Sequence, residues 1–255
     1  MIIVSSIFIF GLFIGSFLNV LSDRLPKGEN FLNSRSYCPS CKHNLSFFDL
    51  IPVISFIVLK GKCRYCKKRI SFWYPLSEIT TAVVFVLAYL TSLQSFMSIY
   101  FIFLLLISSL LIIVFLTDIK YGIILDKIIT FAVFIAVLYL IIFENSSIIS
   151  HFIAGLLALL FFLLLVVFTK GKGMGFGDVK LSFFMGLLLG IPGVIISLYI
   201  AFLTGAFVAI ILILWRKKRF FKDTISFGPF LVLGTLITLF WGSLLNPLLL
   251  RLIGF

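Results

Sequence analysis

The strongest constraint on this chain is a series of apolar runs, most of them close to 20 residues long, that contain almost no charge. A helix of that length crosses the hydrocarbon core of a bilayer, which is about 30 Å thick. The chain is 62% hydrophobic with a mean hydropathy of +1.26, whereas soluble domains are about half apolar. The sequence therefore predicts an all-α polytopic membrane protein with about eight transmembrane helices. The expected spans are residues 2–22, 76–90, 97–117, 128–143, 148–168, two helices within 179–215, and 229–250.

The first run has no basic segment before it and no small-residue cleavage site after it, so we expect it to stay in the mature protein. The run 179–215 is interrupted by Gly190-Ile191-Pro192-Gly193. Proline removes a helix donor and glycine favours a turn, so two helices joined by a tight hairpin are expected there. The apolar segment 50–59 is too short to cross and contains Pro52. It is predicted to be an interfacial or packed segment of the polar region 23–75.

Basic residues are distributed unevenly between the two sides of the predicted membrane. All but one of the 21 Lys and Arg residues fall in alternate loops, and the exception is Arg251. This bias places both termini outside and the long region 23–75 in the cytoplasm. The same bias accounts for the net charge of +12, so we expect no nucleic-acid partner; the bilayer itself is the expected surroundings.

Two carboxylates stand at the edges of apolar runs. Asp118 ends the run 97–117, and Asp178 lies in the glycine-rich stretch Gly173-Met174-Gly175-Phe176-Gly177-Asp178 that opens the next-to-last apolar region. An ionised side chain near hydrocarbon costs about 2.5–3.5 kcal/mol, so such residues indicate a functional site. Both acids are expected on the same side at similar depth. Two carboxylates that share a proton can activate a water molecule, which indicates peptide hydrolysis at the membrane edge.

Other interpretations of these acids are open at this point. Asp178 could simply cap its helix, and Asp118 could simply end the preceding one. A proton-coupled transporter would also need intramembrane acids. It would however need corresponding broken helices in two repeats, and only one short segment opened by glycines is evident.

Four cysteines form two C-x2-C motifs within the region 23–75. They are Cys38 with Cys41, and Cys63 with Cys66. Four thiolates at this spacing can hold Zn²⁺ tetrahedrally, and disulfides are disfavoured in the cytoplasm. A structural zinc is therefore predicted, with free thiols or a transient redox pair as the alternatives. A zinc-organised membrane scaffold, which would be indifferent to both aspartates, is a rival function for the whole protein. His43 is surplus to the four ligands and is expected in a solvated loop, and His151 is expected to be structural.

The stretch 173–180 resembles the Gly-x-Gly-Asp motif of intramembrane-type aspartic proteases, and its surroundings, with Gly228 to Gly234, resemble the type IV prepilin leader peptidases. The resemblance implies that Asp178 and Asp118 are the catalytic pair, because Asp118 and Asp126 match the family's Asp-x7-Asp pattern. Asp126 is interpreted as a supporting residue and not as a catalytic one. Leu125 departs from the Pro that is usual before the second Asp.

Residues 15–20, 24–26 and 49–78 are similar to the family's N-terminal signatures. The expected supporting residues of the catalytic loop are Gly175, Gly177 and Lys180.

The long N-terminal region, as in the long members of that family, implies a second activity, N-methylation of the new pilin N-terminus from S-adenosylmethionine. Candidate residues for binding this methyl donor are Glu78, Asn19 and Arg24. Each has a structural alternative: Glu78 complements a helix dipole, Asn19 bonds a neighbouring helix, and Arg24 anchors the cytoplasmic side. The alternative is a peptidase without methyltransferase activity.

The resemblance also implies an enzyme of the bacterial inner membrane whose active site faces the cytoplasm and whose substrates are prepilins or pseudopilins. The expected division is residues 1–22 as the first transmembrane helix, 23–75 as the cytoplasmic zinc region associated with methyl transfer, and 76–255 as the peptidase core.

Overall fold

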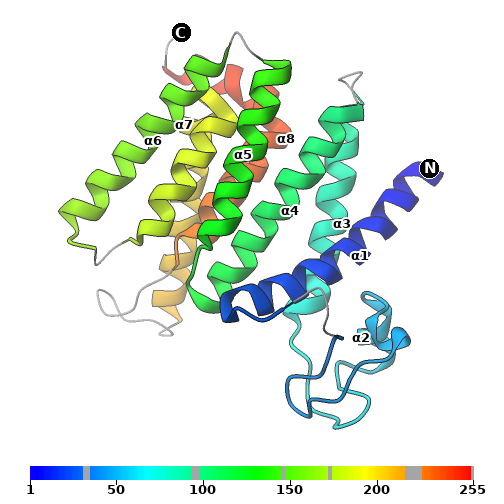
Figure 1. The fold of residues 1–255 in the computed structure, drawn as a ribbon. Coiled ribbons are helices and arrows are strands. Elements are labelled where there is room, and N and C mark those ends of the chain that lie inside the picture. Colours follow the sequence, from blue (N-terminus) through cyan, green and yellow to red (C-terminus); the bar gives the residue numbers. More distant parts are fainter. Residues whose placement is uncertain (31–34, 94–97, 145–146, 172–173, 216–225, 254–255) are drawn as a thin grey trace. The chain divides into compact units, whose positions relative to one another are not determined.

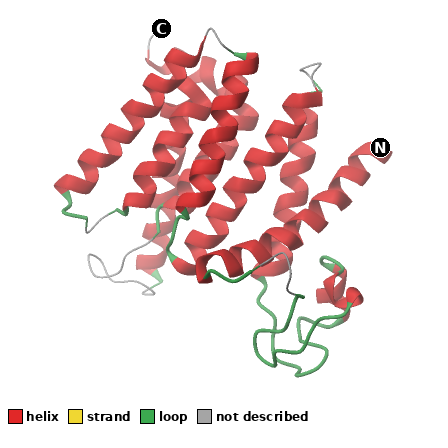
Figure 2. Ribbon diagram, viewed as in Figure 1, coloured by secondary structure: helices red, strands yellow, loops and turns green. Residues whose placement is uncertain are grey.

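The computed structural model of the protein describes residues 1–30, 35–93, 98–144, 147–171, 174–215 and 226–253. Across these residues the regular structure is helical, and apart from two isolated bridges no β-structure occurs (Figure 2). This confirms the all-α expectation. The elements are α1 (Ile2–Arg24), η1 (Leu25–Lys27), η2 (Phe47–Leu50), α2 (Ile54–Val58), α3 (Trp73–Ser92), α4 (Ser98–Tyr121), α5 (Asp126–Phe143), α6 (Ile148–Phe168), α7 (Phe176–Leu214) and α8 (Gly228–Ile253).

Within the described ranges, seven helices are long and apolar enough to cross a membrane. Six of them coincide with predicted spans to within a few residues. The seventh, α7, has 39 residues and would measure about 58 Å if straight, nearly twice the hydrocarbon thickness. It is therefore not a single straight crossing.

The backbone of α7 is interrupted at Gly190 and Ile191, whose dihedral angles are not helical. Gly190 has φ of +62°, a conformation that glycine adopts without strain. Residues on either side of this break lie along the same stretch of α6. The Ser182 hydroxyl approaches the Ala158 carbonyl at 3.3 Å, and the Phe202 ring stacks on Phe162 at 6.3 Å between centroids.

Because residues 182 and 202 both neighbour residues 158–162, the chain must turn back between them. The predicted hairpin is confirmed: α7 supplies two apolar segments rather than one, so the seven candidate helices of the described ranges correspond to eight apolar segments. His151 stabilises the turn, since its Nδ1 lies 2.9 Å from the Leu187 carbonyl oxygen. This agrees with the structural role expected for His151.

The chain divides into two compact units, Met1–Ile113 and Val114–Phe255, with the boundary inside α4. Unit 1 contains α1, α3, the first part of α4, and the segment that joins α1 to α3. We call that segment, residues 25–72, the knuckle region; it lies at the end where α1 stops and α3 begins (Figure 1). Unit 2 contains the end of α4 and the helices α5 to α8. The boundaries proposed from sequence at residues 22 and 75 stay a prediction.

Close packing within each unit depends on small residues. In unit 1, Gly11 of α1 faces Ala82 of α3, and Gly15 faces Thr81. In unit 2, a Cβ on Gly186 would lie 2.5 Å from the Ala154 carbonyl oxygen of α6. Small residues let helix backbones approach closely in a medium that provides no hydrophobic driving force between helices.

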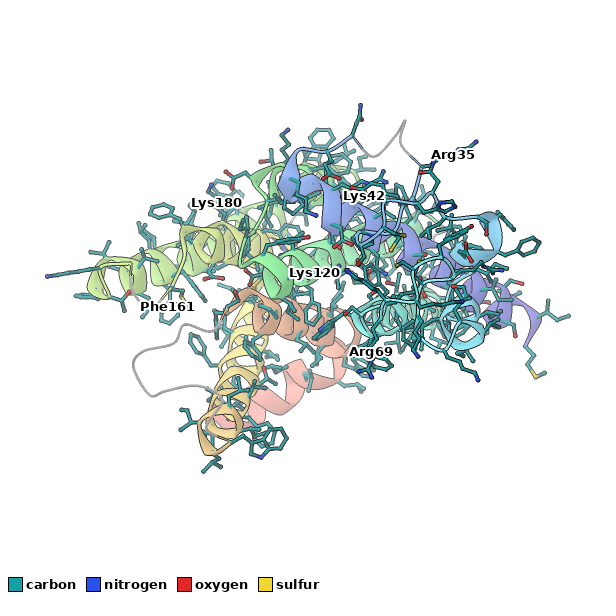
Figure 3. All side chains as sticks on the ribbon, turned by 90° about the horizontal axis from the view of Figure 1, so that it is seen from below. Arg35, Lys42, Arg69, Lys120, Phe161 and Lys180 are labelled. Atoms are coloured by element: carbon teal, nitrogen blue, oxygen red, sulfur yellow. The ribbon has the colours of Figure 1, made fainter. Side chains whose placement is uncertain are left out.

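Basic side chains lie in loops and at helix ends, as the sequence indicated. Seen from below, Arg35, Lys42 and Arg69 belong to the knuckle region, and Lys120 and Lys180 belong to helix ends of unit 2 (Figure 3). Several residues used in the sequence argument lie outside the described residues. They are Lys172, Gly173, Arg216, Lys217, Lys218, Arg219 and Lys222.

We expect Gly234→Ala to destabilise unit 2, whereas Gly242→Ala on the same helix should be tolerated. A Cβ on Gly234 would collide with the Ser197 carbonyl oxygen of α7, while one on Gly242 would lie 3.7 Å from Thr238, an ordinary contact. Overpacking of this kind costs about 1–3 kcal/mol. Thermal unfolding of the two variants in detergent measures the difference, and equal melting temperatures would contradict the described α7–α8 packing.

Candidate active site and metal centre

Asp118 lies in the last two turns of α4, and its side chain is 5% exposed. The sequence had indicated that Asp118 lies just beyond the helix. Because α4 continues to Tyr121, the acid lies inside the helix. The Ser226 side chain and the Gly228 backbone N–H stand close enough to the carboxylate to stabilise negative charge on it. One oxygen, Oδ2, has no hydrogen-bond partner among the described residues. That oxygen is also shielded from solvent, so the structure buries one acceptor of the pair without a partner.

Gly228, the first residue of α8, makes room for the Asp118 carboxylate. A Cβ at this position would collide with Asp118 Oδ2 and would lie 3.1 Å from its Cγ. The helix start also brings the Gly228 backbone N–H and the positive end of the helix dipole close to this carboxylate. Any residue larger than glycine here would displace Asp118.

Asp178 is the third residue of α7 and is 7% exposed. Its Oδ2 accepts a hydrogen bond from the Gly175 backbone N–H at 3.2 Å, and its own N–H donates to the Gly175 carbonyl at 3.2 Å. The N-cap residue of α7 is Gly175 and not Asp178, but the carboxylate satisfies the Gly175 N–H from the third helical position. This bond also fixes the direction of the side chain.

Unit 2 brings the two acids together. Asp118 lies near enough for its charge to act on Asp178. Between the starts of α7 and α8 lies Ile124, from the loop that follows α4. A Cβ on Gly177 would come within 2.9 Å of Ile124 Cβ, and one on Gly228 within 3.2 Å of its Cδ1. The site is thus assembled from the end of α4, the loop 122–125 and the first turns of α7 and α8.

Lys180 does not pair with either buried acid. Its Nζ lies 2.7 Å from Asp126 Oδ1, and both side chains are substantially exposed. This pair joins the first turns of α7 and α5. Surface ion pairs contribute about 0–1 kcal/mol, so its effect on the site is one of positioning.

Two buried carboxylates at adjoining helix ends, with one free oxygen, suit general acid–base chemistry. Like charges a few ångströms apart do not both ionise readily, so such a pair holds a proton between its members. One member can then accept a proton from water while the other donates a hydrogen bond to a carbonyl.

The four cysteines meet in the knuckle region. Their sulfur atoms all lie within 4.8 Å of one another, and Cys38 Sγ is 3.9 Å from Cys66 Sγ. A tetrahedral zinc with Zn–S distances of about 2.3 Å requires sulfurs about 3.8 Å apart. The residues therefore fit a four-thiolate zinc site.

The two C-x2-C motifs have the same backbone hydrogen bonds. Cys38 N–H donates to the His43 carbonyl, as Cys63 N–H donates to that of Lys68. In each motif the residue after the second cysteine, Lys42 or Lys67, has a positive φ near 60°. In the first motif, backbone N–H groups point at the sulfur atoms. Burial opposes ionisation of Cys38, but N–H groups of Cys41 and Ser40 lower the pKa of this thiol to about 7.

Neighbouring side chains hold the second motif in place. Asp49 of η2 accepts hydrogen bonds from the Ser46 hydroxyl at 2.8 Å and from Arg64 Nε at 2.7 Å. Despite the opposing effect of burial, these bonds lower the pKa of Asp49 below its ordinary value. His43 is exposed, as expected, and stacks on Tyr65 at 3.7 Å.

Asn19 belongs to a buried polar cluster between α1 and α3. Its Nδ2 donates to the Tyr74 carbonyl at 3.2 Å, and its Oδ1 accepts from the Ser77 hydroxyl at 2.8 Å. Tyr74 in turn donates from its hydroxyl to Asp23 at 2.7 Å. The helix–helix bond expected as one role of Asn19 is therefore present.

Glu78 and Arg24 connect these helices to the knuckle region. Glu78 Oε2 accepts the Val53 backbone N–H at 2.8 Å, and Arg24 donates to the Arg35 carbonyl at 2.9 Å. Both side chains are buried, and among the described residues Glu78 forms no ion pair. A buried carboxylate without a counter-ion is a position that a cationic group would complement.

The sequence analysis did not identify Ser226 or Ile124 as neighbours of the two aspartates, or Val53 as the partner of Glu78. The dipeptide Gly228-Pro229 is a helix-start signal that could have located the first residue of α8. No local pattern shows that this helix start meets Asp118, because that contact depends on how distant helices pack.

These features define a class of protein, a polytopic membrane protein with paired acids at helix ends and a four-cysteine metal-binding region. The chain belongs to the type IV leader peptidase family. Residues 9–92 match the bacterial peptidase A24 N-terminal domain, and residues 105–210 match the type IV leader peptidase family.

Curated relatives carry the name prepilin leader peptidase/N-methyltransferase. The chain is 34% identical to the one from Bacillus subtilis (strain 168) over 247 residues, which cover 94% of both chains. It is 31% identical to the one from Aeromonas hydrophila over 267 residues, 94% of this chain and 91% of the relative. No solved structure matches significantly.

We expect the purified protein to hold about one zinc per chain, and we expect Cys38→Ser to lose it, because each sulfur fills one of four tetrahedral positions. Ser40→Ala, within the same motif, removes no ligand and is the matched control. Elemental analysis after purification without chelators measures the metal. Full zinc content in Cys38→Ser, or none in the wild type, would contradict the assignment.

Proposed function

We propose that this protein cleaves the leader peptide of type IV prepilins or pseudopilins with the Asp118–Asp178 pair. The observation that carries the proposal is that two acids, far apart in sequence, are buried together where α4 ends and α7 begins. The names of the relatives supply the substrate class. Gly175 and Gly177 shape the start of α7, and Lys180 positions that start through Asp126.

In the proposed reaction, one ionised carboxylate removes a proton from a water molecule, which attacks the carbonyl carbon of the scissile peptide bond. The other carboxyl, protonated, donates a hydrogen bond to the carbonyl oxygen. The tetrahedral intermediate then breaks its C–N bond. The new amine takes up a proton, and the leader leaves with a carboxylate terminus.

The proposed location is the bacterial inner membrane, with the acids facing the cytoplasm and both termini outside. The supporting observation is the distribution of Lys and Arg between alternate loops. The first pass of α7, from Phe176 to Gly190, is only about 20 Å long. Because a segment of that length is shorter than the hydrocarbon core, Asp178 at its start would lie below the cytoplasmic surface of the membrane.

We further propose that Zn²⁺ bound by the four cysteines is structural. The sulfur separations and the two matching turns support this. With all four coordination positions filled by thiolates, the ion would hold the two halves of the knuckle region together and would leave no position for a substrate.

The proposed second activity is methylation of the new N-terminal amine, with Glu78, Asn19 and Arg24 at the binding site for S-adenosylmethionine. That molecule, when bound, supplies the methyl group. The buried Glu78 carboxylate, which lacks an ion-pair partner among the described residues, fits a cationic sulfonium or amine. Asn19 and Arg24 hold the adjoining helix and loop through their hydrogen bonds.

We expect Asp118→Asn and Asp178→Asn each to reduce prepilin cleavage by at least about 100-fold, because each removes a proton-transfer group without changing side-chain shape. Glu29→Gln is the control, since this acid is exposed and belongs to unit 1, whereas both aspartates belong to unit 2. The assay is cleavage of a purified prepilin in detergent, followed by mass spectrometry. Cleavage that survives either substitution would return that aspartate to a purely structural role.

We expect Glu78→Gln to abolish methylation of the cleaved product while cleavage continues. Glutamine keeps an oxygen that can accept the Val53 N–H but removes the negative charge. Thr80→Ala, on an exposed face of the same helix, is the control. The mass of the product with added S-adenosylmethionine measures methylation. An unmethylated product from the wild-type enzyme would indicate a peptidase alone, and normal methylation by Glu78→Gln would remove Glu78 from the site.

A further inference from the structure

The knuckle region exposes several large apolar side chains although it lies outside the candidate spans. Phe47 and Phe48 of η2 are 75% and 69% exposed, and Ile57 and Val58 of α2 are 66% and 69% exposed. Large exposed apolar patches in a polar environment indicate an interaction surface.

The exposed apolar side chains of α2 share one face of that helix. In α2, the exposed residues Ile54, Ile57 and Val58 follow the i, i+3, i+4 spacing of a single helix face. Phe56, on the other side, packs edge-on against Phe72 at 6.2 Å between ring centroids. One side of α2 therefore packs against Phe72, whereas the side that carries Ile54, Ile57 and Val58 is exposed.

The position of α2 along α3 sets its depth. The Val53 N–H, immediately before α2, is bonded to Glu78, the sixth residue of α3. That places the start of α2 beside the second turn of α3, about 8 Å from its first residue. Since α3 has 20 residues, about 30 Å, and needs nearly all of them to cross, its first residue lies at the boundary of the hydrocarbon and its second turn lies about 8 Å inside it, a depth that interfacial helices reach with their apolar face.

Side chains around α2 match the chemistry of that boundary. Trp73 begins α3 and is 42% exposed, and aromatic rings of this kind concentrate at the headgroup level. The chain that follows α2 is basic, and its cationic side chains are exposed: Lys60, Lys62, Lys67, Lys68 and Arg69. Such clusters are attracted to anionic lipid headgroups.

We propose that α2 and η2 insert their exposed apolar side chains into the headgroup–acyl boundary of the bilayer that the transmembrane helices cross. The occupant of this surface is lipid, and basic residues 60–69 bind its anionic headgroups. The knuckle region is then held on the membrane by α2 as well as by Glu78 and Arg24. This inference depends on the membrane-spanning fold of unit 1 and not on the catalytic assignment.

The test is site-specific photocrosslinking of the full-length protein in nanodiscs of phosphatidylcholine and phosphatidylglycerol. Benzoylphenylalanine replaces Ile57, and after irradiation mass spectrometry identifies what position 57 has bonded to. The negative control is the same probe at Ser40, which is exposed within the first C-x2-C motif and lies outside the basic segment 60–69. The positive control is the probe at Phe134 of α5, which is 61% exposed on an apolar helix. Retained zinc shows that each probe variant is folded.

We expect phospholipid adducts at position 57 at a yield comparable to that at position 134, and a yield at position 40 that is lower by an order of magnitude. A probe at Ile54, on the same face, should repeat the result at position 57. Lipid adducts at position 134 but none at positions 54 and 57 would overturn the proposal. Crosslinks from position 57 to a second copy, or to an added prepilin, in place of lipid would overturn it in favour of a protein partner.

Discussion

The structure of unit 2 depends on keeping two carboxylates at the edge of hydrocarbon. Asp118 is tolerated there because α8 begins at Gly228, which has no side chain to displace it and presents an N–H group to it. Asp178 is tolerated because it satisfies the N–H of Gly175 at the start of α7. The break at Gly190 limits the first part of α7 to residues 176–190, about 20 Å, which is shorter than a full crossing.

In unit 1 the corresponding constraint is the attachment of a polar region to apolar helices. Glu78 and Arg24 make this attachment through backbone groups rather than through other side chains. The contact therefore fixes chain geometry while it leaves the Glu78 charge without an ionic partner among the described residues. A residue can hold a loop and meet a cationic ligand, so the structural and functional interpretations of Glu78 are compatible.

Sequence patterns were sufficient for elements that depend on local composition. The spans, the α7 hairpin and the cysteine cluster follow from apolar length, Gly-Ile-Pro-Gly chemistry and ligand spacing, and all three are confirmed. The catalytic roles stay proposals. Contacts between distant segments were not predictable: neither the approach of Gly228 to Asp118 nor that of Val53 to Glu78 has a local signature. Lys180 could be assigned to the site by its motif, but its pairing with Asp126 required the fold.

The most direct test of the central claim is a double-mutant cycle on cleavage with Asp118→Asn, Asp178→Asn and the variant that carries both. Two carboxylates that share one proton act as a single unit, so removal of either should disable the reaction completely. The account predicts that the double variant cleaves prepilin no more slowly than the slower single variant. Losses that multiply in the double variant would show that the two acids act independently, and would contradict the paired mechanism.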